Sequence, residues 1–281
     1  MRIHILSDLH FEFQRWRKVW DLRTVNADLH VLAGDIGVGL SGIQWALNAF
    51  TKPVIYVMGN HEHYGQRPME ELIHKAREKA TGTHVHFLEN DCVVIDGVRF
   101  LGCTLWTDFA LFGAERRQEM MDHAAVEMSD YANIHVSRKG GRPNLPSVAR
   151  SDKHGQARDR LTPTVSLALH HESRSFLEQK LDSSCRPGVA AESWTRTVVV
   201  SHHAPTALSQ PSDEPAQAID AAYASNLDDL VAQSDLWLHG HVHTAACSSI
   251  GGTPVVTNCR GYKDAGPYAV RGFDPFRVVE I

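Results

Sequence analysis

The chain has 281 residues, which is enough for one large α/β domain with a buried core. Its formal net charge of -5 argues against a protein whose whole surface binds nucleic acid. The first residues lack the long apolar segment of a signal peptide, and no later apolar run reaches about 18 residues. We therefore expect a cytoplasmic protein without membrane association. Its five cysteines are scattered without any C-x-x-C pair, which favours reduced thiols.

In the first part of the chain, apolar runs alternate with segments of helical spacing. The runs at residues 2–7, 27–33 and 53–58 each stop where a polar motif begins, as expected of buried strands. Residues 41–50 and 68–80 place apolar side chains at roughly helical intervals. Near-continuous apolar strands alternating with helices predict βαβ units, in which helices cover the sheet.

The pattern then changes to short strands. Residues 85–88, 92–95 and 99–104 are strand candidates, and Asp96-Gly97 is a strong hairpin turn between the last two. Residues 107–164 show few sustained apolar patterns. We interpret this stretch as a variable insertion that acts as a cap or lid.

The last part of the chain returns to regular elements. A helix is predicted at 165–181, and Ser225 followed by Asp228 resembles the start of another helix. Further apolar segments predict strands at 197–200, 236–238, 253–257 and 277–281. The sequence contains neither an internal repeat nor a linker that would separate domains. We therefore predict a single domain over residues 1–281.

Five short polar motifs stand out in this framework. They are Asp8-Leu9-His10, Gly34-Asp35, Gly59-Asn60-His61-Glu62, His202-His203 and Gly240-His241-Val242-His243. Ligands of open α/β sheets bind at the carboxyl ends of strands, and most of these motifs follow an apolar strand candidate, so their side chains can converge. The donors are carboxylate, amide and imidazole groups without thiolate, which suits manganese, iron, cobalt or zinc. Magnesium is disfavoured, because imidazoles are poor ligands for a hard ion.

The order of these motifs resembles the calcineurin-like metallophosphoesterase superfamily, whose pattern is D-x-H, G-D, G-N-H-[DE], H, G-H-x-H. The match runs from about Asp8 to His243, which is most of the chain. The resemblance implies an α/β fold, a two-sheet β-sandwich flanked by α-helices, and a centre of two divalent metal ions. It assigns one ion to Asp8, His10, Asp35 and His243, and the other to Asp35, Asn60, His202 and His241. Asp35 would bridge the ions.

Two metal ions about 3.5–4 Å apart can clamp the attacking and leaving oxygens of a phosphoester. Two divalent ions bring four positive charges, and two carboxylates with a bridging hydroxide remove three, so the predicted site keeps a net positive charge that attracts phosphate. The bridging hydroxide is the predicted nucleophile. The resemblance also implies that His61, beside the ligand Asn60, is the general acid, and Glu62 is a candidate to orient it.

The resulting prediction is a phosphodiesterase. A phosphomonoesterase or a nucleotide pyrophosphohydrolase would use the same residues, and a non-catalytic scaffold of this fold would be expected to have lost part of the motif set. We predict substrate contacts from Asn60, His61 and Arg260, whose planar guanidinium suits phosphate oxygens, although a surface ion pair explains Arg260 equally well. A nucleic-acid substrate has only the basic segment 137–160 in its favour. We interpret this segment first as a solvated loop, and the alternative is a mobile lid that contacts an anionic substrate. The sequence does not indicate an oligomeric state.

Several histidines lie outside these predicted roles. His203 adjoins a predicted ligand and is left out of the ligand set. His170 and His171 are predicted on an exposed face of the helix at 165–181.

Overall fold

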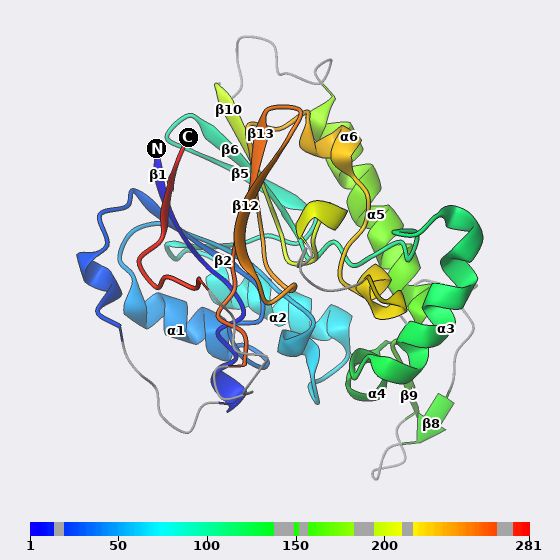
Figure 1. Cartoon of the computed structure of the whole chain (residues 1–281). Coiled ribbons are helices and arrows are strands. Elements are labelled where there is room, and N and C mark those ends of the chain that lie inside the picture. Colours follow the sequence, from blue (N-terminus) through cyan, green and yellow to red (C-terminus); the bar gives the residue numbers. More distant parts are fainter. Residues whose placement is uncertain (14–19, 138–148, 152–156, 183–193, 210–215, 263–271) are drawn as a thin grey trace.

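The computed structural model contains two large β-sheets, a small three-stranded sheet and flanking helices (Figure 1). The structure describes residues 1–13, 20–137, 149–151, 157–182, 194–209, 216–262 and 272–281. In this part of the chain no helix is long and apolar enough to cross a membrane. The cysteines that lie within it, Cys92, Cys103, Cys247 and Cys259, are free thiols.

The first sheet has the strand order β14-β1-β2-β3-β4. Its strands are β14 (Val278–Glu280), β1 (Arg2–Leu6), β2 (Leu29–Ala33), β3 (Val54–Val57) and β4 (Val85–Phe87). All neighbours are parallel except β14, which pairs antiparallel with β1. Both faces of β2 and β3 are buried, which explains why these strands are continuous apolar runs in the sequence.

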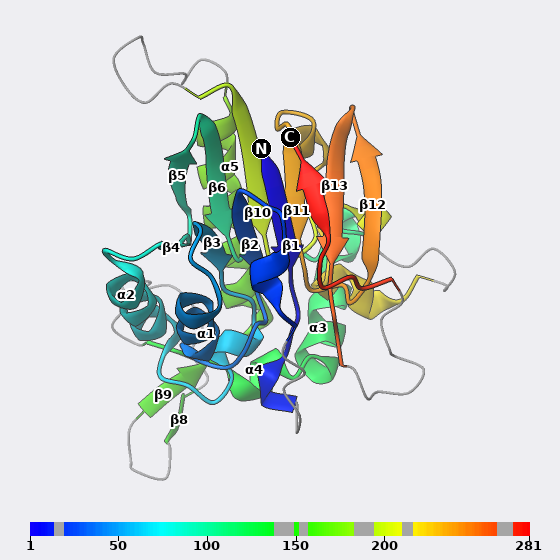
Figure 2. The ribbon, with the colours of Figure 1, turned by 90° about the vertical axis from the view of Figure 1, so that its left-hand side faces the viewer.

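The second sheet has the strand order β12-β13-β11-β10-β6-β5 (Figure 2). Its strands are β12 (Ala245–Ile250), β13 (Thr253–Asn258), β11 (Leu236–His239), β10 (Arg196–Ser201), β6 (Val98–Cys103) and β5 (Asp91–Ile95). The four inner strands are parallel, and the two edge strands are antiparallel to their neighbours. The predicted hairpin turn joins β5 to β6, with positive φ angles at Asp96 and Gly97.

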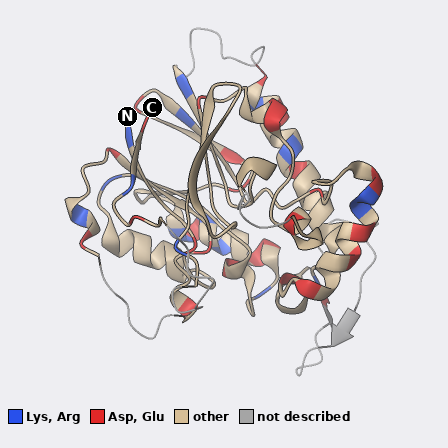
Figure 3. Ribbon diagram, in the orientation of Figure 1, with Lys and Arg blue, Asp and Glu red and all other residues tan. Residues whose placement is uncertain are grey.

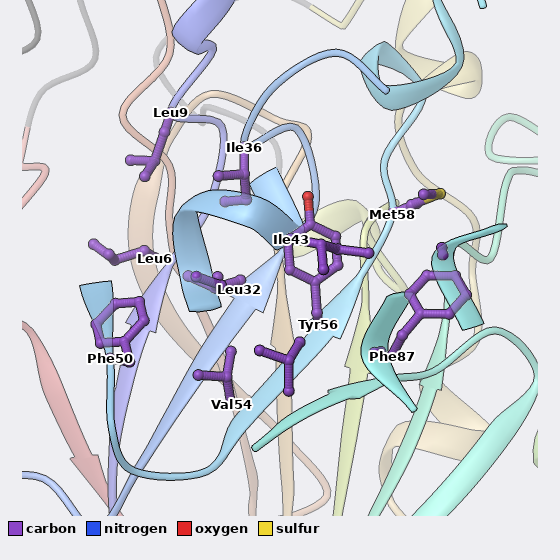
Figure 4. Close-up of a cluster of buried hydrophobic side chains, with 14 of the residues drawn as sticks. Leu6, Leu9, Leu32, Ile36, Ile43, Phe50, Val54, Tyr56, Met58 and Phe87 are labelled. Carbon is purple, nitrogen blue, oxygen red and sulfur yellow. The ribbon is translucent and has the colours of Figure 1, made fainter. Parts of the chain in front are cut away.

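The two sheets pack face to face through apolar side chains. The first sheet contributes Ile5, Val31 and Ile55, and the second contributes Val200 and Leu238 to the same buried cluster. Alternate residues of β1, β2 and β3 point to the opposite face, where they pack against the helix α1 (Ser41–Ala49) and the helix α2 (Met69–Ala80) (Figure 4). The predicted two-sheet sandwich is therefore confirmed.

The outer face of the second sheet is covered by the helices α5 (Pro163–Leu181) and α6 (Asp228–Val231), on the other side of the sheets from α1 in Figure 1. Helix α5 begins two residues before the predicted start, because Thr162 caps it. Its side chain accepts a hydrogen bond from the backbone N–H of Val165 at 3.3 Å, and Pro163 occupies the first turn.

The predicted insertion at 107–164 contains more regular structure than its sequence indicates. It holds η4 (Ala114–Arg116), α3 (Arg117–Glu127), α4 (Asp130–Asn133), β7 (His135–Val136), β8 (Ala149–Ser151) and β9 (Ala157–Arg160). Helix α3 packs Met120, Met121 and Ala124 against η7 (Ala218–Ala222), a 3₁₀ helix of another region. Residues 138–148 and 152–156, with most of the basic segment, lie outside the described residues. The role of this region as a lid stays a prediction, as does the single-domain organisation.

Candidate metal centre

The predicted ligands follow the carboxyl ends of strands from both sheets. Asp8, Asp35 and Asn60 come after β1, β2 and β3, whereas His202 and His241 come after β10 and β11. All five side chains are buried. The sandwich thus places donors from distant parts of the sequence at one shared edge.

The donor atoms form compact groups that could hold metal ions. Within each group the atoms lie within 4.8 Å of one another, and the groups are Asp8–His10–His243, His10–Asp35–His61 and Asp35–His202–His241. Asp35 belongs to two groups, since its Oδ2 lies 3.8 Å from Nε2 of His10 and 3.5 Å from Nε2 of His202. The Oδ1 atom of Asn60 lies 3.0 Å from Nε2 of His202. All seven predicted ligands are therefore close together.

The backbone at these ligands is strained. Asp8, His10, Asp35, His241 and His243 have φ angles of 54°, 46°, 55°, 69° and 45°. This left-handed region is uncommon for residues other than glycine and costs about 1–3 kcal/mol at each position. The concentration of such angles at the predicted ligands indicates that the loops are shaped to direct their side chains to one place.

Close packing of the loops explains two of the motif glycines. A Cβ atom at Gly59 would lie 2.6 Å from Nε2 of His202, and one at Gly240 would lie 2.7 Å from the carbonyl oxygen of Ala33. Both distances are shorter than van der Waals contact. Only glycine fits at these positions without moving the histidine or the strand end.

The electrostatics of the centre keep both carboxylates ionised. Burial opposes ionisation of Asp8 and Asp35, but interactions with His243 and His202 outweigh it and hold the pKa of each carboxyl below its ordinary value. Burial, together with repulsion by His203 and His202, holds the pKa of His241 well below its ordinary value. Burial opposes the charge of His202, but Asp35 and Asp8 outweigh it and raise the pKa of His202 to about 10. Metal ions bind ionised carboxylates and neutral imidazoles, so a metal ion would displace the His202 proton.

The Nε2 atom of His241 is buried and, among the residues that the structure describes, has no hydrogen-bond partner. A buried polar atom without a partner is costly unless a ligand engages it. This atom, the ionised carboxylates and the converging imidazoles fit divalent metal ions.

Glu62 supports the ligand loops instead of contacting the His61 imidazole. Its carboxylate accepts hydrogen bonds from the backbone N–H groups of Asp35, Ile36 and Gly59 at 2.9, 3.0 and 2.9 Å, and from the Tyr56 hydroxyl at 2.7 Å. It thereby ties the loop after β2 to the loop after β3. Burial and the charge of Asp35 raise the pKa of Glu62 to about 7.

The carboxylate beside His61 belongs to Glu12, which sequence reasoning missed. Oε1 of Glu12, in the 3₁₀ helix η1 (Phe11–Phe13), lies 3.0 Å from Nδ1 of His61 and 3.1 Å from Nδ1 of His10. Burial disfavours the charged imidazolium, but Asp35 and Glu12 outweigh this effect and raise the pKa of His61 to about 9. The only indication in the sequence was that Glu12 lies two residues after the predicted ligand His10.

Two further residues fix the surroundings of the motif at Asn60 and His61. The Tyr262 hydroxyl lies 3.1 Å from Nε2 of His61. Asp130, at the start of α4, accepts a hydrogen bond from Nδ2 of Asn60 at 2.8 Å and another from the Tyr64 hydroxyl. Because the amide nitrogen is engaged by Asp130, its oxygen faces His202. Both Tyr262 and Asp130 lie outside the motifs and gave no local sequence signal.

Arg260, predicted to contact substrate, is 6% exposed and lies beneath the Asp8–His10 loop. Its Nη1 donates a hydrogen bond to the carbonyl oxygen of Leu9 at 3.0 Å, and its guanidinium lies 5.4 Å from the centre of the Trp20 ring.

The remaining histidine predictions had mixed outcomes. His203 is buried, with its ring centre 4.1 Å from that of His241. The predicted exposure of His170 is wrong, because the insertion covers this face of α5, and its Nδ1 lies 3.4 Å from the carbonyl oxygen of Trp106. His171 is exposed as predicted.

A cavity of about 610 Å³ opens onto the predicted metal ligands. The predicted site residues that line it are Asp35, Asn60, His61, His241 and His243. Tyr64 and Tyr262, whose rings pack against His61, line it as well. The general-acid candidate and the ligand groups therefore face the same space.

The sequence matches the model of the calcineurin-like phosphoesterases over residues 1–245. It matches no curated protein. Among solved structures, it is similar to phosphopantetheinyl hydrolase from Mycobacterium tuberculosis, with a TM-score of 0.63, 18% identity, and coverage of 92% of this chain and 89% of that chain. A dimetal phosphatase from Danio rerio has a TM-score of 0.47 and 15% identity, with 91% and 86% covered. At 18% identity, the similarity to phosphopantetheinyl hydrolase shows a shared fold.

Proposed function

Because the chain belongs to the calcineurin-like phosphoesterase family and is a metal-dependent phosphoester hydrolase, we propose that it is a phosphodiesterase with two divalent metal ions. One ion would be held by Asp8, His10, Asp35 and His243, and the other by Asp35, Asn60, His202 and His241. The position of Asp35 in two donor groups supports this division. Manganese, iron, cobalt or zinc suits these oxygen and imidazole donors. When bound, the ions would neutralise phosphate charge and activate the attacking water.

His61 is the proposed general acid. It lines the cavity beside the ligand groups, and in the metal-free protein burial is outweighed by Asp35 and Glu12, which raise its pKa to about 9. Glu12 engages its Nδ1, so Nε2 is the atom that transfers a proton to the leaving oxygen. Tyr262, which contacts Nε2, helps to hold this side of the ring toward the cavity.

The composition of the cavity wall favours a diester over a monoester. Among the lining residues that the structure describes, none is lysine or arginine. A phosphomonoester is a dianion near neutral pH, and its recognition commonly uses such side chains. A phosphodiester carries a single charge and a second organic group. This observation carries the choice of a phosphodiesterase.

The proposal is tested by comparing bis(p-nitrophenyl) phosphate with p-nitrophenyl phosphate on manganese-reconstituted protein. We expect faster cleavage of the diester. Faster cleavage of the monoester would favour a phosphatase, and hydrolysis of neither would favour a nucleotide pyrophosphohydrolase or a non-catalytic scaffold.

Two variants separate the proposed roles. On a diester with an alkyl leaving group, which needs protonation, His61→Ala should lower kcat by roughly 10²–10⁴-fold with unchanged metal content. Asp35→Asn should lower the number of bound metal ions, measured by elemental analysis without any assay of activity. Loss of metal from His61→Ala would show that this histidine has a structural role instead.

A further inference from the structure

The cavity extends beyond the metal ligands to a second wall built by the insertion and by the segment around η7. This wall contains Leu111 and Phe112 before α3, Glu127 and Met128 at its end, and Asp220 and Tyr223 in and after η7. It is therefore aromatic and apolar, with two carboxylates. The organic part of a substrate whose phosphate occupies the metal centre would meet this wall.

Among the described residues of this wall, the charged side chains are acidic. Glu127 and Asp220 both line the cavity, which has no described lysine or arginine in its lining. Acidic residues are frequent along α3 and α4, although basic residues lie at the start of α3 (Figure 3). Burial, together with the charges of Asp130, Asp220 and Glu127, raises the pKa of Tyr223, so all three carboxylates act on this one side chain. A second anionic group would be repelled here.

The aromatic part of the wall adjoins the metal centre. The Tyr223 ring centre lies 4.9 Å from that of His241, whose buried and unpartnered Nε2 belongs to the proposed site. Phe112 and Tyr223 also belong to one apolar cluster with Met128. An organic group joined to the phosphate by a short chain would reach these aromatic side chains.

We infer that this wall binds a cationic organic group, an alkylammonium joined to the phosphodiester through a short carbon chain. The inference rests on the proposed phosphodiesterase function and names its substrate class. Aromatic rings attract alkylammonium ions through the ring quadrupole, and Glu127 and Asp220 add electrostatic attraction. Nucleotides with a pyrophosphate would bring negative charge to these carboxylates, so they fit this wall poorly.

The test uses two diesters that share p-nitrophenol as leaving group. One is p-nitrophenyl phosphocholine, and the other replaces its trimethylammonium group by the uncharged tert-butyl group of the same shape. With manganese-loaded protein, we expect kcat/KM to be roughly 2- to 30-fold higher for the cationic ester, as expected for a cation–π contact. The ratio should fall as ionic strength rises.

Variants of the wall residues test whether the preference for the cationic ester comes from this wall. In the double variant Glu127→Gln with Asp220→Asn, the ratio of kcat/KM for the two esters should move toward one. The amide oxygen of the Asp220→Asn side chain can still accept the hydrogen bond from the Gln217 N–H. Asp122→Asn removes an exposed carboxylate of α3 that does not line the cavity, and it should leave the ratio unchanged. Circular dichroism verifies that both variants are folded.

The outcomes distinguish this inference from the proposed function. Equal hydrolysis of both esters, or faster hydrolysis of the uncharged one, would overturn the cation site and leave the phosphodiesterase intact. Hydrolysis of neither ester nor of bis(p-nitrophenyl) phosphate would refute the phosphodiesterase itself. A ratio that persisted in the double variant would refute the assignment to Glu127 and Asp220.

Discussion

Replacing Glu62 by glutamine should destabilise the metal-free protein. The carboxylate accepts four hydrogen bonds, and the Oε2 atom takes two of them, from the N–H groups of Asp35 and Gly59. In the Glu62→Gln variant an NH₂ group replaces one oxygen, and the less costly orientation places it at the Oε1 position. There the Tyr56 hydroxyl can accept from the NH₂ group, so only the buried N–H of Ile36 loses its acceptor. One unsatisfied buried donor costs about 1–3 kcal/mol, which is the expected loss of stability.

The free energy of unfolding should be measured by urea denaturation at pH 8, above the pKa of about 7 of Glu62. Glu78→Gln, an exposed change on α2, is the matched control and should shift stability by less than about 0.5 kcal/mol. Equal midpoints for the two variants would refute the support role of Glu62. Unchanged stability combined with a selective loss of hydrolysis of poor leaving groups would restore the sequence-based assignment of Glu62 to His61.

Three other changes test separate features. Glu12→Gln should slow the cleavage of alkyl esters about tenfold more than the cleavage of p-nitrophenyl esters, because only poor leaving groups need protonation. An equal loss of rate across a series of leaving groups would contradict this role of Glu12. Gly59→Ala should weaken manganese binding in calorimetry, since its methyl group would lie 2.6 Å from Nε2 of His202; wild-type affinity would show that the loop adapts. Burial and the neighbouring His4 lower the pKa of His30 to about 3 in the folded state. Between about pH 6.5 and 3 the unfolded state therefore binds a proton at His30 that the folded state does not, so stability falls as the pH drops through this range. His30→Leu should flatten that decline in urea titrations across this range, and an unchanged slope would exclude His30 as its source.

Helices and strands could be predicted from the sequence where their buried residues form a regular apolar pattern. The strands β2, β3 and β10 were predicted because both of their faces are buried, so they are apolar throughout. Strand β12 was missed, since it is an edge strand with alternating exposed residues and several small side chains. Helix α3 was missed because only Met120, Met121 and Ala124 are buried on it.

Local motifs predicted correctly that the proposed ligands follow strand ends. The residues that support them depend on tertiary contacts. Asp130 reaches Asn60 from 70 positions away, and Tyr262 reaches His61 from 201 positions away. Contacts over such sequence separations leave no helical or strand pattern in the sequence that could predict them. Glu62 shows the converse difficulty, because adjacency to His61 in sequence suggested a contact, whereas the turn of η3 (His61–His63) directs its carboxylate into the loops behind the centre.

The proposed metal centre and the sandwich core depend on each other. The first sheet supplies oxygen donors at Asp8, Asp35 and Asn60, and the second supplies imidazoles at His202 and His241. The strained φ angles at several of these residues persist only if the strands that precede them are held firmly. The buried cluster between the two sheets provides that support, because a shift of one sheet against the other would disrupt its packing. The same apolar alternation that forms the sandwich therefore fixes the separation of the two ligand sets.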